Sequence, residues 1–353
     1  MERFGVLGGS HESKSEASGD NPLGDQTRSV TILGSVALVI GACTLTGCAD
    51  AVPPPELSQA NDLVHVADDT AARFAGTWEL IDVERRNADG EVLPADPVDR
   101  LGYLMYDPAG YMGVVIQTGD REAYASANPT PEEAHEALRT YTSYFGAFSV
   151  DEAAGEVTHH LRGSLNPSGV GSNYVRGFEF REDLLTLQPP SGPSGIQSRL
   201  TWQRVPDRPE LTPEHQRFIG FWEIDSIERR TESGELLPTE QFVDGFVLYT
   251  TSGHMAVHLM RAERRPPEGT QLTSEEALEA MRSYASYFGP VSLHEAEGYI
   301  VHHVIGQTNP GGIGTDAQRY YEFTDNQLIL KPPPSTVDGE RVQSALTWTR
   351  ISR

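Results

Sequence analysis

The sequence has few cysteines and a shortage of basic residues. Its two cysteines, Cys43 and Cys48, both precede the part that has the pattern of a folded domain, which excludes a disulfide framework there. Lysine and arginine together number 27 against 51 acidic residues, so the formal net charge is −24. This charge opposes binding to nucleic acid and to anionic lipid headgroups, because both need a basic face.

Motifs for metal, phosphate and nucleophilic chemistry are also missing from the sequence. No residues have metal-ligand spacing, and no Gly-rich loop follows a strand and opens a helix. No Gly-x-Ser-x-Gly nucleophile elbow is present. We therefore expect no metal, no cofactor and no nucleic-acid partner.

The apolar run Val30–Leu45 is too short and too rich in small residues for a comfortable membrane span. It follows Arg28 and leads into Leu-Thr-Gly-Cys at 45–48, the pattern of a signal peptide and its cleavage site. A plain secretory signal or a short buried helix is the alternative. Residues 1–47 are thus predicted to be a signal peptide with an N-terminal extension.

Leu-Thr-Gly-Cys also resembles the lipobox of bacterial lipoproteins. That resemblance implies that Cys48 becomes the first mature residue and carries a diacylglycerol on its sulfur. Acyl chains anchor by about 0.8 kcal/mol per buried CH₂. We expect a lipid-anchored protein of the cell envelope, at the outer membrane or the periplasmic face, since Ala49 follows the cysteine. Residues 48–70, polar and with three consecutive prolines, predict a flexible tether.

The rest of the chain contains one unit twice. Matching segments follow in the same order at a nearly constant offset of 143 to 146 residues: 74–78 with 218–222, 90–94 with 234–238, 141–146 with 284–289, 159–160 with 302–303, and 200–202 with 346–348. Each copy is too long for a solenoid repeat. Two self-sufficient domains, at 71–206 and 207–353, are therefore predicted.

Short segments rich in β-branched and aromatic residues, bounded by Gly, Asp and Pro, predict strands inside each unit. In the first copy they lie near Trp78–Arg86, Gly102–Tyr106, Tyr111–Gln117, Ala147–Val150, Glu156–Arg162, Tyr174–Phe180, Leu184–Gln188 and Arg199–Arg204. Eight short antiparallel strands suit a closed barrel, which leaves no exposed edge.

One helix interrupts the strands of each copy. Capping boxes at 130–133 and 273–276 predict where it begins. Ala134, Leu138, Tyr141 and Phe145 then share a face at helical spacing, and a glycine follows as the stop. The matching face of the second copy consists of Ala277, Met281, Tyr284 and Phe288. We expect each helix to pack over one end of its barrel as a plug.

Gly-Thr-Trp at 76–78 and Gly-Phe-Trp at 220–222 resemble the Gly-x-Trp signature of lipocalins and their calycin relatives. This resemblance implies that Arg204 lies over Trp78, and Arg350 over Trp222, as a cation–π closure. Together with the Tyr-x-x-Tyr-Phe-Gly, His-His and Asn-Pro motifs, it extends to the bacterial and fungal lipocalin-like domain family over Phe74–Arg353. The implied fold is mostly β: two tandem lipocalin-like antiparallel β-barrels, each with a cavity and one short amphipathic helix. No agreed reaction comes with it.

The His-His pairs give the first candidate site. Alternate residues of a strand face opposite sides. His159 therefore shares a face with the apolar Val157 and Leu161 and should point into the barrel, whereas His160 points outward. The same alternation turns His302 inward. An interior histidine could hold a ligand carboxylate or act as a general base. The alternative is a buried histidine satisfied by a neighbouring tyrosine or glutamate.

Arginines and tyrosines complete the candidate ligand-binding set. An inward Arg176, with Arg319 in the second copy, would clamp a carboxylate. A surface arginine beside glutamate is the alternative. The tyrosine hydroxyls that could reach the cavity mouth are those of Tyr141, Tyr144, Tyr284 and Tyr287.

These features predict a membrane-anchored lipoprotein that binds small apolar or amphipathic molecules in its barrels. One alternative is a non-redox isomerase or cyclase that uses the same cavity. Another is a structural interaction module whose barrels are filled by side chains.

Overall fold

The computed structural model describes residues 68–95, 98–192, 194–239, 242–269, 271–337 and 339–352. The predicted signal peptide, Cys48 and residues 48–67 of the predicted tether lie outside the described residues. Both barrels belong to one compact unit of the chain. No helix in the described ranges is long and apolar enough to cross a membrane.

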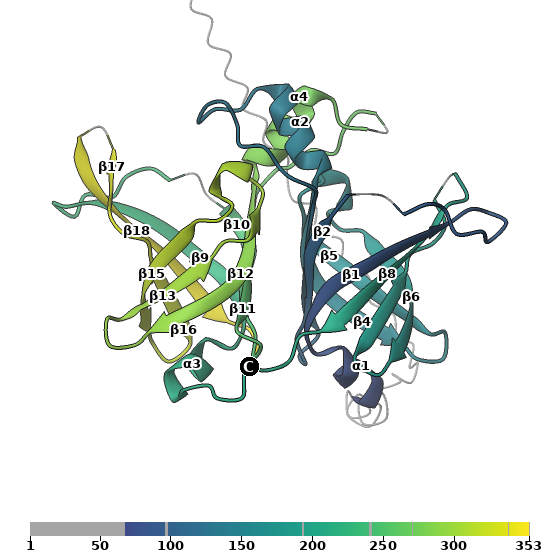
Figure 1. Cartoon of the computed structure of the whole chain (residues 1–353). Helices are drawn as coiled ribbons and strands as arrows, with labels where there is room; N and C mark the ends of the chain where they lie inside the picture. Colours follow the sequence, from purple (N-terminus) through teal and green to yellow (C-terminus); the bar gives the residue numbers. More distant parts are fainter. Residues whose placement is uncertain are drawn as a thin grey trace, which may run out of the picture. The chain divides into compact units, whose positions relative to one another are not determined.

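The first domain is a closed antiparallel barrel in which each strand pairs with the next and the last with the first (Figure 1). Its strands are β1 (Gly76–Arg86), β2 (Arg100–Tyr106), β3 (Tyr111–Thr118), β4 (Tyr141–Asp151), β5 (Glu156–Ser164), β6 (Asn173–Arg181), β7 (Leu184–Gln188) and β8 (Gln197–Arg204). The expected barrel is confirmed.

The second domain repeats this topology. Its ring consists of β9 (Gly220–Thr231), β10 (Phe242–Tyr249), β11 (His254–Arg261), β12 (Tyr284–His294), β13 (Tyr299–His303), β15 (Asp316–Phe323), β16 (Gln327–Lys331) and β18 (Glu340–Arg350). Pairing of β11 with β12 closes it. Two further short strands lie outside this ring. β14 (Gly306–Gln307) pairs with β12, and β17 (Ser335–Val337) pairs with β18.

A short helix that the sequence analysis did not predict closes one end of each barrel. These helices are α1 (Asp68–Phe74) and α3 (Pro213–Phe218), and α3 begins with Thr212 as its cap and proline at its first position. Phe74, at the end of α1, is fully buried and packs edge-on against Phe178 and Phe180 of β6. This end is the barrel floor.

The expected Trp–Arg closure lies at the same end. The indole nitrogen of Trp78 donates to the Phe74 carbonyl at 2.7 Å, and the Arg204 guanidinium lies 4.1 Å from the Trp78 ring centroid. Arg204 also donates to the Ala75 carbonyl at 2.7 Å. In the second barrel, Arg350 lies 3.8 Å over Trp222. Strand, helix and turn are thus joined at the floor of each barrel.

The predicted mid-domain helix begins where the capping box places it but ends early. It is α2 (Pro131–Arg139) in the first domain and α4 (Ser274–Arg282) in the second. Tyr141 and Phe145 lie in β4, so their assignment to the helix was wrong, as was that of Tyr284 and Phe288, which lie in β12. Aromatic and β-branched residues at 141–145 favour a strand, and their three- and four-residue spacing imitates a helical face.

The plug prediction was also wrong. α2 and α4 pack against each other, as Figure 1 shows. The structure thus gives each domain two short α-helices within the described ranges: one closes its own barrel, and the other joins the two domains.

The outer faces of β2–β4 and of β9–β12 form a shared core between the barrels. Its largest buried members are Tyr103, Tyr141, Phe145, Phe221, Phe246, Tyr284 and Phe288. At its centre Ser143 Oγ lies 2.9 Å from Ser286 Oγ, and two arginines bond across it: Arg121 to the carbonyls of Gln307 and Thr308, and Arg264 to those of Ser164 and Leu165. Because these outer faces are buried, β2–β4 carry apolar residues on both sides.

Candidate functional site

The strand alternation that the sequence predicted for the paired histidines holds in both barrels. His159 points into the first barrel and is 1% exposed, and His302 points into the second and is 0% exposed. Their neighbours His160 and His303 point outward. His160 bonds to Ser149 and Asn173, and His303 to Ser292 and Asp316.

Each interior histidine lies between two tyrosine hydroxyls. In the first barrel, Tyr106 OH lies 2.6 Å from His159 Nε2, and Tyr144 OH lies 3.1 Å from His159 Nδ1. The second barrel repeats the arrangement with Tyr249 and Tyr287 around His302, at 2.9 Å and 3.0 Å. Three strands, β2, β4 and β5, bring this group together inside the first barrel.

Burial keeps the histidines neutral. Burial, together with the smaller effect of the Arg176 charge, lowers the pKa of His159 to about 3. The pKa of His302 is well below its usual value for the same two reasons, with Arg319 as the charge. Burial also raises the pKa of Tyr106 and of Tyr144. At neutral pH the ring and both hydroxyls are therefore uncharged.

Counting protons then identifies a free donor. A neutral imidazole has one N–H and one acceptor nitrogen. The shorter contact, from Tyr106, suits an O–H donor, so we assign His159 Nε2 as the acceptor and Nδ1–H as the donor to Tyr144. Since Tyr144 accepts from the imidazole, its own hydroxyl proton must point elsewhere. This group of three side chains keeps one O–H for a ligand.

A cation lies beside this donor. The charge of Arg176 opposes the rise that burial causes in the pKa of Tyr144. Among the described residues no carboxylate forms an ion pair with Arg176. Its guanidinium bonds to the Val175 carbonyl at 3.2 Å and lies 5.1 Å over the Tyr174 ring. A positive charge next to a free O–H favours a carboxylate or a carbonyl oxygen.

Apolar side chains line the barrel interior on both sides of this group. Leu104, Met112, Val157 and Leu185 are buried toward the floor. Toward the other end, the apolar residues that pack against this core are only partly buried: Val83, Ile116, Tyr174 and Leu200. At the floor Phe148, Phe178 and Phe180 are likewise only partly buried.

The structure does not bring all the predicted site residues together. Tyr144, His159 and Arg176, with Tyr287, His302 and Arg319, line the interiors. Tyr141 and Tyr284 lie instead between the barrels, where Tyr141 OH is 3.2 Å from Ser286 Oγ and Tyr284 OH is 3.0 Å from Ser143 Oγ.

Sequence reasoning missed one residue of the site in each barrel. Tyr106 and its counterpart Tyr249 each bond to an interior histidine. Each lies two residues after an inward apolar residue, Leu104 or Val247, so strand alternation could have identified both tyrosines.

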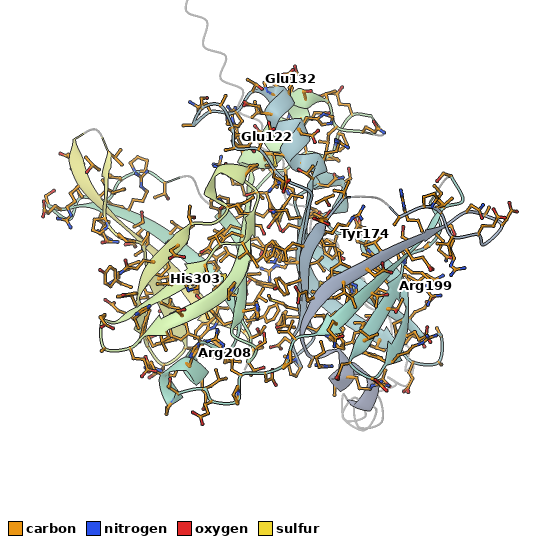
Figure 2. The ribbon with its side chains drawn as sticks, viewed as in Figure 1. Glu122, Glu132, Tyr174, Arg199, Arg208 and His303 are labelled. Atoms are coloured by element: carbon orange, nitrogen blue, oxygen red, sulfur yellow. The ribbon has the colours of Figure 1, made fainter. Side chains whose placement is uncertain are left out.

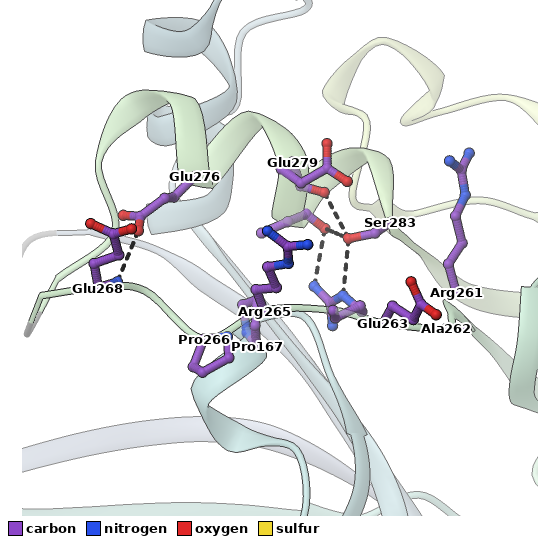
Figure 3. Close-up of a pocket in the computed structure, with 12 residues that line it drawn as sticks. Pro167, Arg261, Ala262, Glu263, Arg265, Pro266, Glu268, Glu276, Glu279 and Ser283 are labelled. Atoms are coloured by element: carbon purple, nitrogen blue, oxygen red, sulfur yellow. Dashed lines mark hydrogen bonds between the residues drawn. The ribbon is translucent and has the colours of Figure 1, made fainter. Parts of the chain in front are cut away.

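Surface pockets beside α2 and α4 are weaker candidates. The pocket in Figure 3 has a volume of about 460 Å³ and is lined by Arg264, Ser283 and Glu276, among others. The Arg264 guanidinium donates to Ser283 and to three carbonyls, those of Ser164, Leu165 and Ala280. Its donors therefore hold the two domains together.

A model of the lipocalin-like domain family matches residues 75–205 and 219–351. The chain therefore belongs to the lipocalin-like domain family, with two copies of the domain. A solved structure of a protein of unknown function from the DUF3598 family of Nostoc punctiforme is similar at 10% identity, covering 78% of this chain and 96% of that chain, with a TM-score of 0.19. No curated protein matches the sequence. Lipocalin-like barrels are a ligand-binding fold, and the barrel interiors are the candidate site.

Proposed function

We propose that this protein is a lipid-anchored lipoprotein of the cell envelope whose barrels bind small amphipathic molecules. The hydroxyl proton of Tyr144 that is free for a ligand, beside the charge of Arg176, supports the binding part of this proposal best, and the second barrel repeats the same residue types at Tyr287, His302 and Arg319. A carboxylate or carbonyl oxygen would accept from this pair at mid-barrel, while the apolar body of the ligand lies along the mouth.

Acid–base catalysis by an isomerase or cyclase receives less support from the same geometry. A general base works best when its pKa is near the operating pH. The pKa of His159 is about 3, and both of its nitrogens contact tyrosine hydroxyls. The histidine is better suited to orienting Tyr144 than to removing a proton from a substrate.

Fluorescence titration with cis-parinaric acid, a slim carboxylate, tests the binding proposal. A hydrogen bond to a charged group contributes about 1.5–3 kcal/mol, so Arg176→Met with Arg319→Met should weaken binding by roughly 10- to 150-fold. The methyl ester of the probe should lose much less affinity, because it has no charge to pair. His160→Asn serves as the outward control. Equal losses for acid and ester would refute the carboxylate site.

The anchor needs a separate test, since it rests on the lipobox at 45–48. Cys48→Ser should remove the acylated residue and shift the protein from the detergent phase to the aqueous phase, or leave it unprocessed. Unchanged membrane attachment in a detergent-partition assay would refute anchoring through Cys48 and would leave the barrel site unaffected.

A further inference from the structure

The two candidate sites share a centre but differ above it. The residue directly opposite the interior histidine in the strand register is Tyr174 for His159 and Ala317 for His302. A phenol ring in the first barrel is thus replaced by a methyl group in the second. Tyr174 is labelled in Figure 2.

The Tyr174 side chain covers one side of the first site. Its ring packs edge-on against Tyr144, with centroids 5.6 Å apart, and the Arg176 guanidinium lies 5.1 Å from the centroid of the Tyr174 ring. Its hydroxyl reaches the turn at Pro167–Gly169, where a Cβ at Gly169 would lie only 3.0 Å from it. The Tyr174 ring therefore extends from Tyr144 to the turn at Pro167–Gly169.

The second barrel fills this space differently. At Gly312, the counterpart of Gly169, a Cβ would clash with the amide of Gln307, a residue whose counterpart in the first barrel is the small Ser164. The amide of Gln307 at the turn thus replaces the far end of the aromatic ring, and Ala317 places only a methyl group at the near end. Consistent with this, Tyr144 is 7% exposed, whereas Tyr287 is only partly buried.

We propose that Tyr174 and Ala317 make the two barrels selective for different ligands. The first site accepts only slim molecules beside its hydroxyl and arginine, because the Tyr174 ring occupies the flank. The second site also accepts a bulky group next to the anionic end. This inference rests on the proposed binding function and specifies the ligand class of each barrel.

Two anionic probes of different shape test the selectivity in the full chain. cis-Parinaric acid is linear next to its carboxylate, whereas 1-anilinonaphthalene-8-sulfonate has fused rings next to its sulfonate. The variant with both Arg176→Met and Arg319→Met supplies the background of non-specific uptake for each probe. We expect two specific sites for the linear probe and one for the bulky probe.

Reciprocal variants assign the selectivity to this position. Tyr174→Ala should raise the affinity of the first barrel for the bulky probe at least tenfold, so that two sites appear. Ala317→Tyr, combined with Gln307→Ser to give the ring the room it has in the first barrel, should abolish the single site. Both variants should keep two sites for the linear probe, which also shows that they fold.

The possible failures are distinct. If the linear probe does not bind specifically, both the binding function and the selectivity are refuted. If the linear probe binds at two sites and the bulky probe does so too in the unmodified chain, only the selectivity is refuted. An unchanged number of bulky-probe sites in both reciprocal variants would likewise exclude Tyr174 and Ala317 as its cause.

Discussion

Acidification should destabilise this protein well above the pH at which carboxylates protonate. Among the described residues, three histidines are almost inaccessible to solvent: His159, His258 and His302. Burial lowers the pKa of His159 and of His258 to about 3 and that of His302 well below its usual value. All three are therefore neutral in the folded chain at pH 5.

The sign follows from proton uptake. In the unfolded chain a histidine titrates near pH 6.5, so between about pH 6.5 and pH 3 the unfolded state binds protons that the folded state does not. Stability is then fully present above the unfolded pKa and is lost as the pH falls through this window. From pH 7 to pH 5 each buried histidine contributes a loss of about 2 kcal/mol, and the three together on the order of 6 kcal/mol.

Such a loss is large against a typical unfolding free energy of about 5–15 kcal/mol. Burial raises the pKa of Asp107 and of Asp244, so protonation of these two carboxyls favours the folded state and offsets part of the loss at the acid end. Urea unfolding at pH 7, 6 and 5, followed by tryptophan fluorescence, measures the net effect.

A single substitution isolates one histidine. His159→Gln should reduce the loss between pH 7 and pH 5 by about 2 kcal/mol, whatever its effect on stability at pH 7. Val157→Ala, on the same strand, should lower the unfolding free energy equally at each pH, because it removes no titratable group. A pH dependence that is identical in the unmodified chain and in His159→Gln would refute the assignment of a neutral buried ring.

Two further substitutions test the packing. Trp78→Ala should lower the unfolding free energy by about 3–5 kcal/mol, since it deletes a fully buried ring that donates to the Phe74 carbonyl; Trp222→Ala should cost a similar amount, and an unchanged urea midpoint would contradict both. Gly113→Ala should lower the unfolding free energy by about 1–3 kcal/mol, because its Cβ would lie 2.9 Å from His258 Nε2. The same substitution in a His258→Val background should lower it clearly less. An equal loss in both backgrounds would show that this contact is not the cause.

Strand positions and side-chain directions were predictable because they depend on a two-residue period within one segment. The pattern around His159 and His160 places one ring among Val157, Leu161 and the barrel core and the other at the surface, and the structure agrees. The end of α2 was not predictable in this way. Residues 141–145 contain apolar side chains at spacings that fit a helix. Their aromatic and β-branched types favour a strand, and the packing of Tyr141 and Phe145 between the barrels stabilises it.

The sequence also contains a pattern that indicates the contact between the barrels, which the interpretation by strand alternation alone overlooked. Residues 103–106 read Tyr-Leu-Met-Tyr, apolar at every position, which indicates a strand buried on both faces. Leu104 and Tyr106 face the barrel interior, whereas Tyr103 and Met105 face the other domain. Which surface would cover the outer face depends on residues far away in the sequence, such as Phe288.

Substitution of the interior arginine, Arg176, distinguishes a ligand-binding barrel from a structural barrel that is filled by side chains. In the described part of the chain no carboxylate pairs with Arg176, so its charge is held partly buried without a counter-ion, which disfavours the folded state. Arg176→Met, of similar length and apolar, should therefore leave the unfolding free energy unchanged or raise it, while it weakens binding of cis-parinaric acid. A structural module predicts the opposite pattern: Arg176→Met would destabilise the fold through the lost contacts of the guanidinium with the Val175 carbonyl and the Tyr174 ring, and probe binding would not depend on it. Urea unfolding and probe titration of the same variant decide between the two, with Tyr144→Phe as the matched loss of the hydroxyl. Stability is kept or raised while affinity falls only if the Arg176 charge binds a ligand.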